Sequence, residues 1–161
     1  MKRAVLLIFI LLTLLTGCRQ EYGILDYQTN NISAECVINE KYKVLIDKDS
    51  DTISLTIKEP ENLEDVIFIL TEDKVQIAKN DLKIPAEKND FRGICAILNI
   101  FSLKEESIIE ARKNNTVLFK NEYGTYQVEY GKGSLPQKVL ITDTEYEYSI
   151  VINGIKTITT E

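Results

Sequence analysis

Apolar and polar residues alternate along most of the chain after residue 31, as they do in strands that bury one face. The alternation is clearest in Ile32–Ile38 and in Thr52–Lys58, where Ile53, Leu55 and Ile57 share one face. Turn-forming residues separate such segments from one another. Further strands are predicted at Tyr42–Ile46, Lys74–Ala78, Leu82–Ile84, Ser107–Lys113, Val117–Asn121, Tyr126–Tyr130, Val139–Thr142, Glu145–Asn153 and Ile155–Thr159. The pattern therefore predicts about ten short strands in one domain, residues 32–161.

Three details of this pattern make sharper predictions. Val66–Leu70 is apolar on both faces, which predicts a strand that is covered from both sides. Pro85 has no N–H to donate, so we expect it to end the strand before it. Asn153-Gly154 is the strongest short hairpin signal in the chain and predicts a turn between two strands.

One segment changes to helical spacing. Phe91, Ile94, Leu98 and Phe101 lie at i, i+3, i+7 and i+10, which predicts a helix over Asp90–Phe101 with an apolar stripe. Parallel strands would need several crossover helices, and the sequence shows only this one. The expected fold is therefore mainly β (α+β), a curved antiparallel sheet or half-barrel with one covering helix.

The first 18 residues follow neither pattern. Lys2 and Arg3 precede an apolar run of about twelve residues, a helix of roughly 18 Å against the roughly 30 Å of a bilayer core. This is typical of a secretory signal and too short for a permanent span. The run ends in Leu15-Thr16-Gly17-Cys18, which resembles the bacterial lipoprotein box.

The lipoprotein box implies cleavage before Cys18 and acylation of the Cys18 thiol with chains such as palmitate. Residues 1–17 are then a signal peptide, and residues 18–31 are the lipidated cysteine and a polar tether. Several acyl chains anchor a protein stably. We therefore expect a cell-membrane lipoprotein on the extracytoplasmic face, or on the outer membrane in a two-membrane cell. An ordinary signal peptide that ends near a cysteine is the alternative.

Charge and composition narrow the function classes. Cleavage removes two of the 19 basic residues and none of the 25 acidic ones, which leaves a net charge of −8. Such a surface repels nucleic acid and anionic headgroups. The chain has no His, the commonest general base and a common metal ligand. We therefore expect no nucleic-acid partner, no cofactor and no enzymatic activity.

One acidic segment imitates a metal site. Asp47, Asp49 and Asp51 match the opening of a calcium loop, but Thr52 stands where the loop needs Gly and Lys58 where it needs Glu. The segment is therefore predicted to be a hairpin turn with no metal.

Two cysteines remain once Cys18 is assigned to the lipid. Cys36 and Cys95 would lie in an exported domain, where a disulfide is chemically permitted. Free cysteines also pack as small apolar residues. The sequence leaves both alternatives open, a disulfide and two buried thiols.

The order of elements resembles the LolA/LolB-like lipoprotein-carrier superfamily over about Ile32 to Thr159. The similar features are a third strand that ends in proline, Thr52–Pro60, an inserted helix, and a closing meander that contains Leu135–Ile141. The resemblance implies a half-barrel with helices over its concave face and an apolar concavity for a lipid. Lining it would be Ile53, Leu55, Ile57, Phe68, Phe91, Ile94, Leu98 and Phe101, for each of which ordinary core packing is the alternative.

The sequence thus favours a lipid-anchored, non-enzymatic protein that binds an apolar ligand, such as a lipid or acyl chain, or a membrane protein partner. A structural or adhesive surface lipoprotein with a fully packed core is the main alternative. A carboxylate-dependent hydrolase is a further one, since the chain has 25 acidic residues.

Overall fold

The computed structural model describes residues 31–158 except 73, 113–114, 132–134 and 144. The predicted signal peptide, Cys18 and nearly all of the tether lie outside the described residues. Within those residues, no helix combines the length and apolar character needed to cross a membrane.

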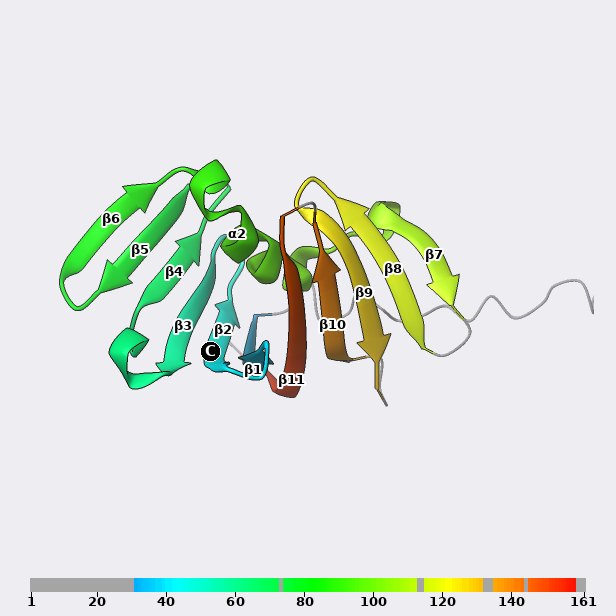
Figure 1. Cartoon of the computed structure of the whole chain (residues 1–161), viewed down its shortest axis with the longest axis horizontal. Coiled ribbons are helices and arrows are strands. Elements are labelled where there is room, and N and C mark those ends of the chain that lie inside the picture. The colour runs from blue at the N-terminus through cyan, green and yellow to red at the C-terminus, as the bar shows by residue number, and fades with distance from the viewer. Residues whose placement is uncertain (1–30, 73, 113–114, 132–134, 144, 159–161) are drawn as a thin grey trace, which may run out of the picture.

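Across the described residues, eleven strands form one antiparallel sheet in the order β6-β5-β4-β3-β2-β1-β11-β10-β9-β8-β7 (Figure 1). The first and last strands of the chain are neighbours at its centre, and β6 and β7 are its two edges. The strands are β1 (Ile32–Ile38), β2 (Tyr42–Lys48), β3 (Ile53–Glu59), β4 (Ile67–Leu70), β5 (Val75–Lys79), β6 (Leu82–Ala86), β7 (Ile108–Arg112), β8 (Thr116–Asn121), β9 (Gly124–Tyr130), β10 (Pro136–Thr142) and β11 (Glu147–Thr157).

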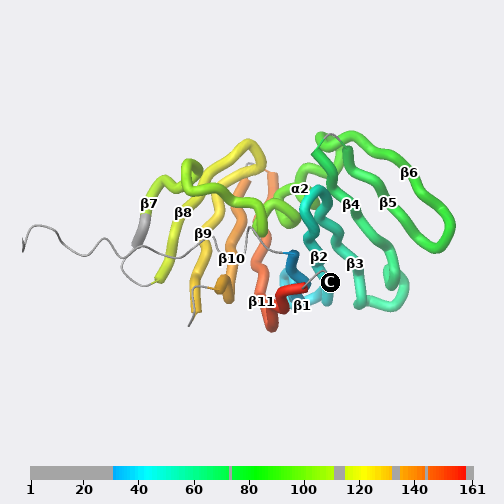
Figure 2. Tube along the Cα trace, turned by 180° about the vertical axis from the view of Figure 1, so that it is seen from behind, coloured from blue at the N-terminus to red at the C-terminus, as the bar shows by residue number. Residues whose placement is uncertain are grey.

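A helical segment runs across one face of this sheet, and the sheet curves around it (Figure 2). It consists of the 3₁₀ turn η3 (Lys88–Phe91), the helix α2 (Arg92–Leu98) and the 3₁₀ turn η4 (Asn99–Ser102). Two further 3₁₀ turns are η2 (Glu61–Leu63) and η5 (Glu105–Ser107). The predicted curved antiparallel sheet with one covering helix is confirmed, although the regular α-helix has only seven residues.

The predicted hairpin at Asn153-Gly154 is wrong. Both residues lie inside the single long strand β11, which pairs with the whole of β1. Glu35 pairs with Gly154 and Cys36 with Ile152, so Asn153 is the extra residue of a β-bulge. The partner strand β1 is far away in sequence, and its pairing on both sides of Asn153 overrides the local turn signal.

Two further strand predictions are wrong. Pro85 lies within β6 and does not end it, because an edge strand tolerates a missing donor. Val66–Leu70 is not covered on both sides, since only Leu70 in β4 is buried, at 8% exposed, and Ile67 and Ile69 are partly exposed.

Two connections between neighbouring strands use left-handed backbone conformations. Asn39 and Glu40 connect β1 to β2 with φ angles of 50° and 57°, and Asn80 begins the β5–β6 turn with a φ of 54°. Asparagine adopts such left-handed conformations more readily than most residues.

Candidate functional site

The face of the sheet that carries the helical segment is where the resemblance places an apolar ligand. Most of this concave face is filled by protein. Of the eight predicted lining residues, five belong to the hydrophobic core and are at most 9% exposed: Ile53, Leu55, Ile57, Leu98 and Phe101. The centre of the concave face is therefore packed by the helical segment.

The other three predicted residues lie at the border of this core. Phe68, Phe91 and Ile94 are half-buried and pack against the core from outside. The rings of Phe68 and Phe91 have centroids 6.0 Å apart and are tilted by 47°. Such a tilted contact is favourable for aromatic pairs. Ligand binding by all eight residues stays a prediction.

The strand register shows where the helical cover ends. Leu55, Phe68, Ile77 and Ile84 are cross-strand neighbours in one row from β3 to β6. Leu55 is 1% exposed, Phe68 and Ile77 are half-buried, and Ile84 is 47% exposed. The helix α2 contacts β3 and β4. Exposure along the row therefore rises as the strands leave the helix.

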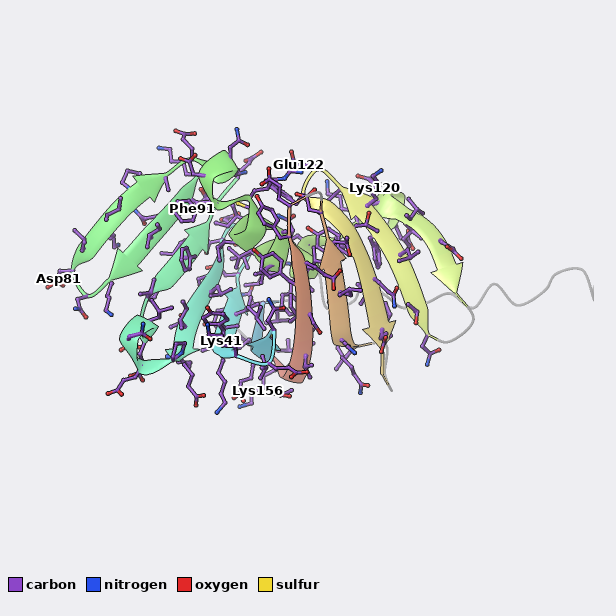
Figure 3. All side chains as sticks on the ribbon, viewed as in Figure 1. Lys41, Asp81, Phe91, Lys120, Glu122 and Lys156 are labelled. Carbon is purple, nitrogen blue, oxygen red and sulfur yellow. The ribbon has the colours of Figure 1, made fainter. Side chains whose placement is uncertain are left out.

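We call the open part of this face the apolar shelf. Leu82 belongs to it because it lies two residues from Ile84 on the same face of β6, and it is 61% exposed. Figure 3 shows Phe91 between the helical segment and the strands of this side. The apolar shelf consists of Phe68, Ile77, Leu82, Ile84, Phe91 and Ile94.

Sequence reasoning missed half of the shelf. Ile77, Leu82 and Ile84 lie on strands that the sequence predicts correctly in position. Their alternation shows that they share a face, but nothing local shows that the helix stops short of them. The missing information is the path of the helical segment.

A polar cluster connects the start of α2 to the half of the sheet from β7 to β11. Arg92 Nε donates a hydrogen bond of 2.8 Å to Asp143 Oδ2, in the β10–β11 connection. The same guanidinium donates to the backbone oxygen of Glu122 and lies 6.0 Å from the ring centroid of Tyr123. Burial raises the pKa of Tyr123 to about 12. The cluster holds the helical segment across the concave face.

Both cysteines of the domain are free, buried thiols, so no disulfide joins Cys36 and Cys95. Cys36 lies in β1 and Cys95 in α2. Burial raises the pKa of Cys36 to about 12 and also raises that of Cys95. Of the two alternatives that the sequence leaves open, the structure has buried thiols.

The calcium-like segment is a turn. Asp49 Oδ1 accepts hydrogen bonds from the backbone N–H groups of Asp51, at 3.0 Å, and Thr52, at 2.8 Å. These bonds lower the pKa of Asp49. Among the described residues, no group of three or more His, Cys, Asp or Glu side chains is placed to hold a metal ion.

A polar cleft of about 590 Å³ lies beside this turn. Its walls come from the β2–β3 and β4–β5 turns, both ends of the helical segment and the β8–β9 turn. Side chains of both charges line it, including Lys48, Lys88, Glu72 and Glu122. The cleft shares no residue with the apolar shelf, and the apolar residues Ile53, Leu70 and Tyr123 line it together with these charged groups.

A scan against protein-family models and a search of curated proteins found no match. Solved structures with a similar fold exist. An uncharacterized conserved protein from Thermus thermophilus has a TM-score of 0.52 at 11% sequence identity, with 88% of each chain covered. A LolA superfamily protein from Nitrosomonas europaea has a TM-score of 0.37 at 6% identity, with 82% of this chain and 86% of that chain covered. The similarity to the Thermus thermophilus protein is a similarity of fold alone.

Proposed function

We propose that this protein is a lipid-anchored extracytoplasmic lipoprotein that binds an apolar ligand, a lipid or an acyl chain, on the apolar shelf and carries out no catalysis. The observation that carries the proposal is the exposure gradient along the row Leu55, Phe68, Ile77 and Ile84. Apolar area that stays exposed next to a core commonly marks a binding surface.

The packing of the concave face determines where a ligand could bind. Leu98 and Phe101 are fully buried against the sheet, so a ligand would lie beside the helical segment and not beneath it. Phe68, Phe91 and Ile94 would then line the inner wall, and Ile77 and Ile84 the floor. The fold resembles that expected for a lipoprotein carrier, which supports a lipid as the ligand class.

The test uses a soluble chain that starts at Arg19, which omits Cys18 and keeps every described residue. Mass spectrometry of the lipids extracted from the purified domain should recover a stoichiometric lipid. A fluorescent fatty acid should bind the lipid-free domain, and Ile77→Ser should weaken this binding about tenfold because it removes apolar contact area.

Ile109→Ser is the matched control. Ile109 lies on β7 at the other edge of the sheet and is 57% exposed, so the same substitution there should leave fatty-acid binding unchanged. Equal loss in both variants, or absence of any bound lipid, would remove the shelf as the site.

The anchor has its own test. Cys18→Ser in the full chain should abolish incorporation of labelled palmitate and release the protein from the membrane fraction. Incorporation that persists in this variant would contradict acylation at Cys18.

A structural or adhesive lipoprotein is the second candidate, and the fully packed centre of the concave face favours it. This function predicts no recovered lipid, together with a shelf-dependent partner in the membrane fraction. Capture of a specific membrane protein by the wild-type domain, lost in Ile77→Ser and kept in Ile109→Ser, would support it.

A further inference from the structure

The β5–β6 hairpin has an electrostatic character of its own. The whole chain has a net charge of −6, but residues 74–86 contain three lysines, Lys74, Lys79 and Lys83, and one acid, Asp81. This hairpin is therefore locally basic, with a net charge of +2, on an acidic protein. Net charge alone predicts repulsion from anionic headgroups, whereas the local charge predicts attraction.

The same hairpin carries a concentrated exposed apolar surface. Six large apolar residues are at least 39% exposed among the described residues, and Leu82 and Ile84 are the two of them that share one face of one strand. Leu82, at 61%, is the most exposed of the six. The other four lie apart from this hairpin: Ile109, Leu135, Val151 and Ile158.

Two lysines flank these apolar residues, one across the hairpin and one within β6. Lys79 pairs with Leu82 across the hairpin, and Lys83 lies between Leu82 and Ile84 on the opposite face of β6. Neither lysine forms an ion pair with another described residue. Figure 3 shows Asp81 at the outer end of the hairpin, away from the body of the sheet. We call Lys79, Leu82, Lys83 and Ile84 the hairpin tip.

The edge position of β6 argues against a protein strand as the occupant of this surface. A strand that adds to a sheet edge uses the backbone donors of that edge, and Pro85 has none. Exposed apolar side chains beside lysines instead match a membrane interface. There the apolar groups enter the acyl boundary while the ammonium groups meet lipid phosphates.

The length of chain before the domain permits this contact. β1 begins at Ile32, and residues 19–30 span at most about 40 Å when extended. With the proposed anchor at Cys18, a bilayer therefore lies within reach of the domain surface. The strands from β1 to β6 span roughly 24 Å across the sheet at the usual strand spacing.

We propose that the hairpin tip docks on the surface of an anionic phospholipid bilayer, with Leu82 and Ile84 inserted at the interface and Lys79 and Lys83 paired with lipid phosphates. Docking would orient the apolar shelf toward the membrane. Leu82 and Ile84 belong to both surfaces and the reach of the tether rests on the proposed anchor, but docking does not require a lipid held on the shelf, so vesicle binding and fatty-acid binding can fail separately.

The test exploits the absence of tryptophan from this chain. Leu82→Trp in the soluble domain that starts at Arg19 introduces a single reporter at an exposed position, so the fold should tolerate it. Vesicles of phosphatidylcholine and phosphatidylglycerol in equal parts should shift its emission to the blue, and brominated acyl chains should quench it. Vesicles of phosphatidylcholine alone should do neither.

Two matched variants complete the test. Ile109→Trp, on the other edge strand, should show no shift with either vesicle. The double substitution Lys79→Glu and Lys83→Glu should weaken vesicle binding by about thirtyfold or more, since each lysine contributes roughly fivefold near an anionic surface. The same reversal at Lys120 and Lys156, two lysines outside the hairpin, should change it little.

High salt should release the domain from the vesicles because it screens the lysines. An equal blue shift for Leu82→Trp and Ile109→Trp, or no shift at all, would overturn the proposal. The proposal would also be overturned if sedimentation showed that the domain is a dimer and that Leu82→Ser makes it a monomer. The surface would then bind a second copy of the chain.

Discussion

The two halves of the sheet have the same alternation of apolar and polar residues but very different burial. In the half from β7 to β11, the inward residues Phe119, Tyr126, Val128, Val139 and Ile141 are at most 1% exposed. In the outer two strands of the other half, β5 and β6, the inward residue Val75 is fully buried, but Ile84 is 47% exposed and Leu82 is 61% exposed.

The difference arises from the path of the helical segment. Ile100 and Phe101 lie on its second part, Leu103 follows directly, and all three are at most 1% exposed, so they fill the space over the β7–β11 half. At the other end the segment begins just after β6, and α2 contacts β3 and β4, while Ile84 and Leu82 on β6 stay exposed. A strand pattern therefore shows which side chains share a face, and the covering element decides whether that face is core or binding surface.

The largest expected effect is on the free energy of unfolding, and it should differ between the covered and the open part of the sheet. Phe101→Ala should lower the free energy of unfolding by about 3–5 kcal/mol, because it leaves a cavity in the covered half. Phe68→Ala should cost about half as much, since that ring is already partly exposed. Urea unfolding followed by circular dichroism measures both. Equal losses would contradict the difference in packing.

The reactivity of the two cysteines tests how well the centre of the sheet and the helix α2 exclude solvent. Burial raises the pKa of Cys36 from 9.0 to about 12, so at mildly alkaline pH its thiolate is about a thousandfold rarer than in the unfolded chain. Both Cys36 and Cys95 should therefore resist a thiol reagent in the soluble domain until it unfolds. Mass spectrometry of the labelled domain gives the rate at each cysteine.

The same shift has a pH consequence with a definite sign. The unfolded Cys36 thiol ionises near pH 9 and the folded one only near pH 12, so the stability that burial provides is present below pH 9 and is lost as the pH rises from about 9 to 12. Cys36→Ala should flatten this part of the pH profile. An unchanged profile would show that other groups dominate it.

Removal of the polar cluster at the start of α2 should have a moderate effect. Arg92→Met deletes the hydrogen bonds to Asp143 and to the backbone of Glu122, which tie the helical segment to the β7–β11 half. The urea midpoint should fall clearly. Lys104→Met is the control, because its ion pair with Glu106 is 3.8 Å long and exposed, and such pairs contribute little.

The smallest effect is expected on the open half. Leu82→Ser should change the free energy of unfolding by no more than about 0.5 kcal/mol, since Leu82 is 61% exposed. A larger loss would show that Leu82 supports the core and is not a free surface residue. The same variant should still weaken vesicle binding, which separates a docking role from a structural one.

The sequence predicted most of what depends on local pattern. The alternation in Thr52–Lys58 located β3 and its inward face, and the spacing from Phe91 to Phe101 located the covering helix. The prediction at Asn153-Gly154 failed because the distant strand β1 pairs on both sides of that signal. The candidate lining residues of β3 and β4 share one face of the sheet, but their depth beneath the helical segment was not readable from their spacing.

What the sequence by itself determined is a curved antiparallel sheet, a single covering helix and the face of each strand that turns inward, because these follow from periods of two and 3.6 residues. The tertiary structure alone decided that β1 and β11 meet at the centre and that the helical segment leaves Leu82 and Ile84 of the edge strand β6 exposed. The path of a covering element depends on packing between residues far apart in the chain. That path leaves Ile77, Leu82 and Ile84 as an open apolar surface rather than core.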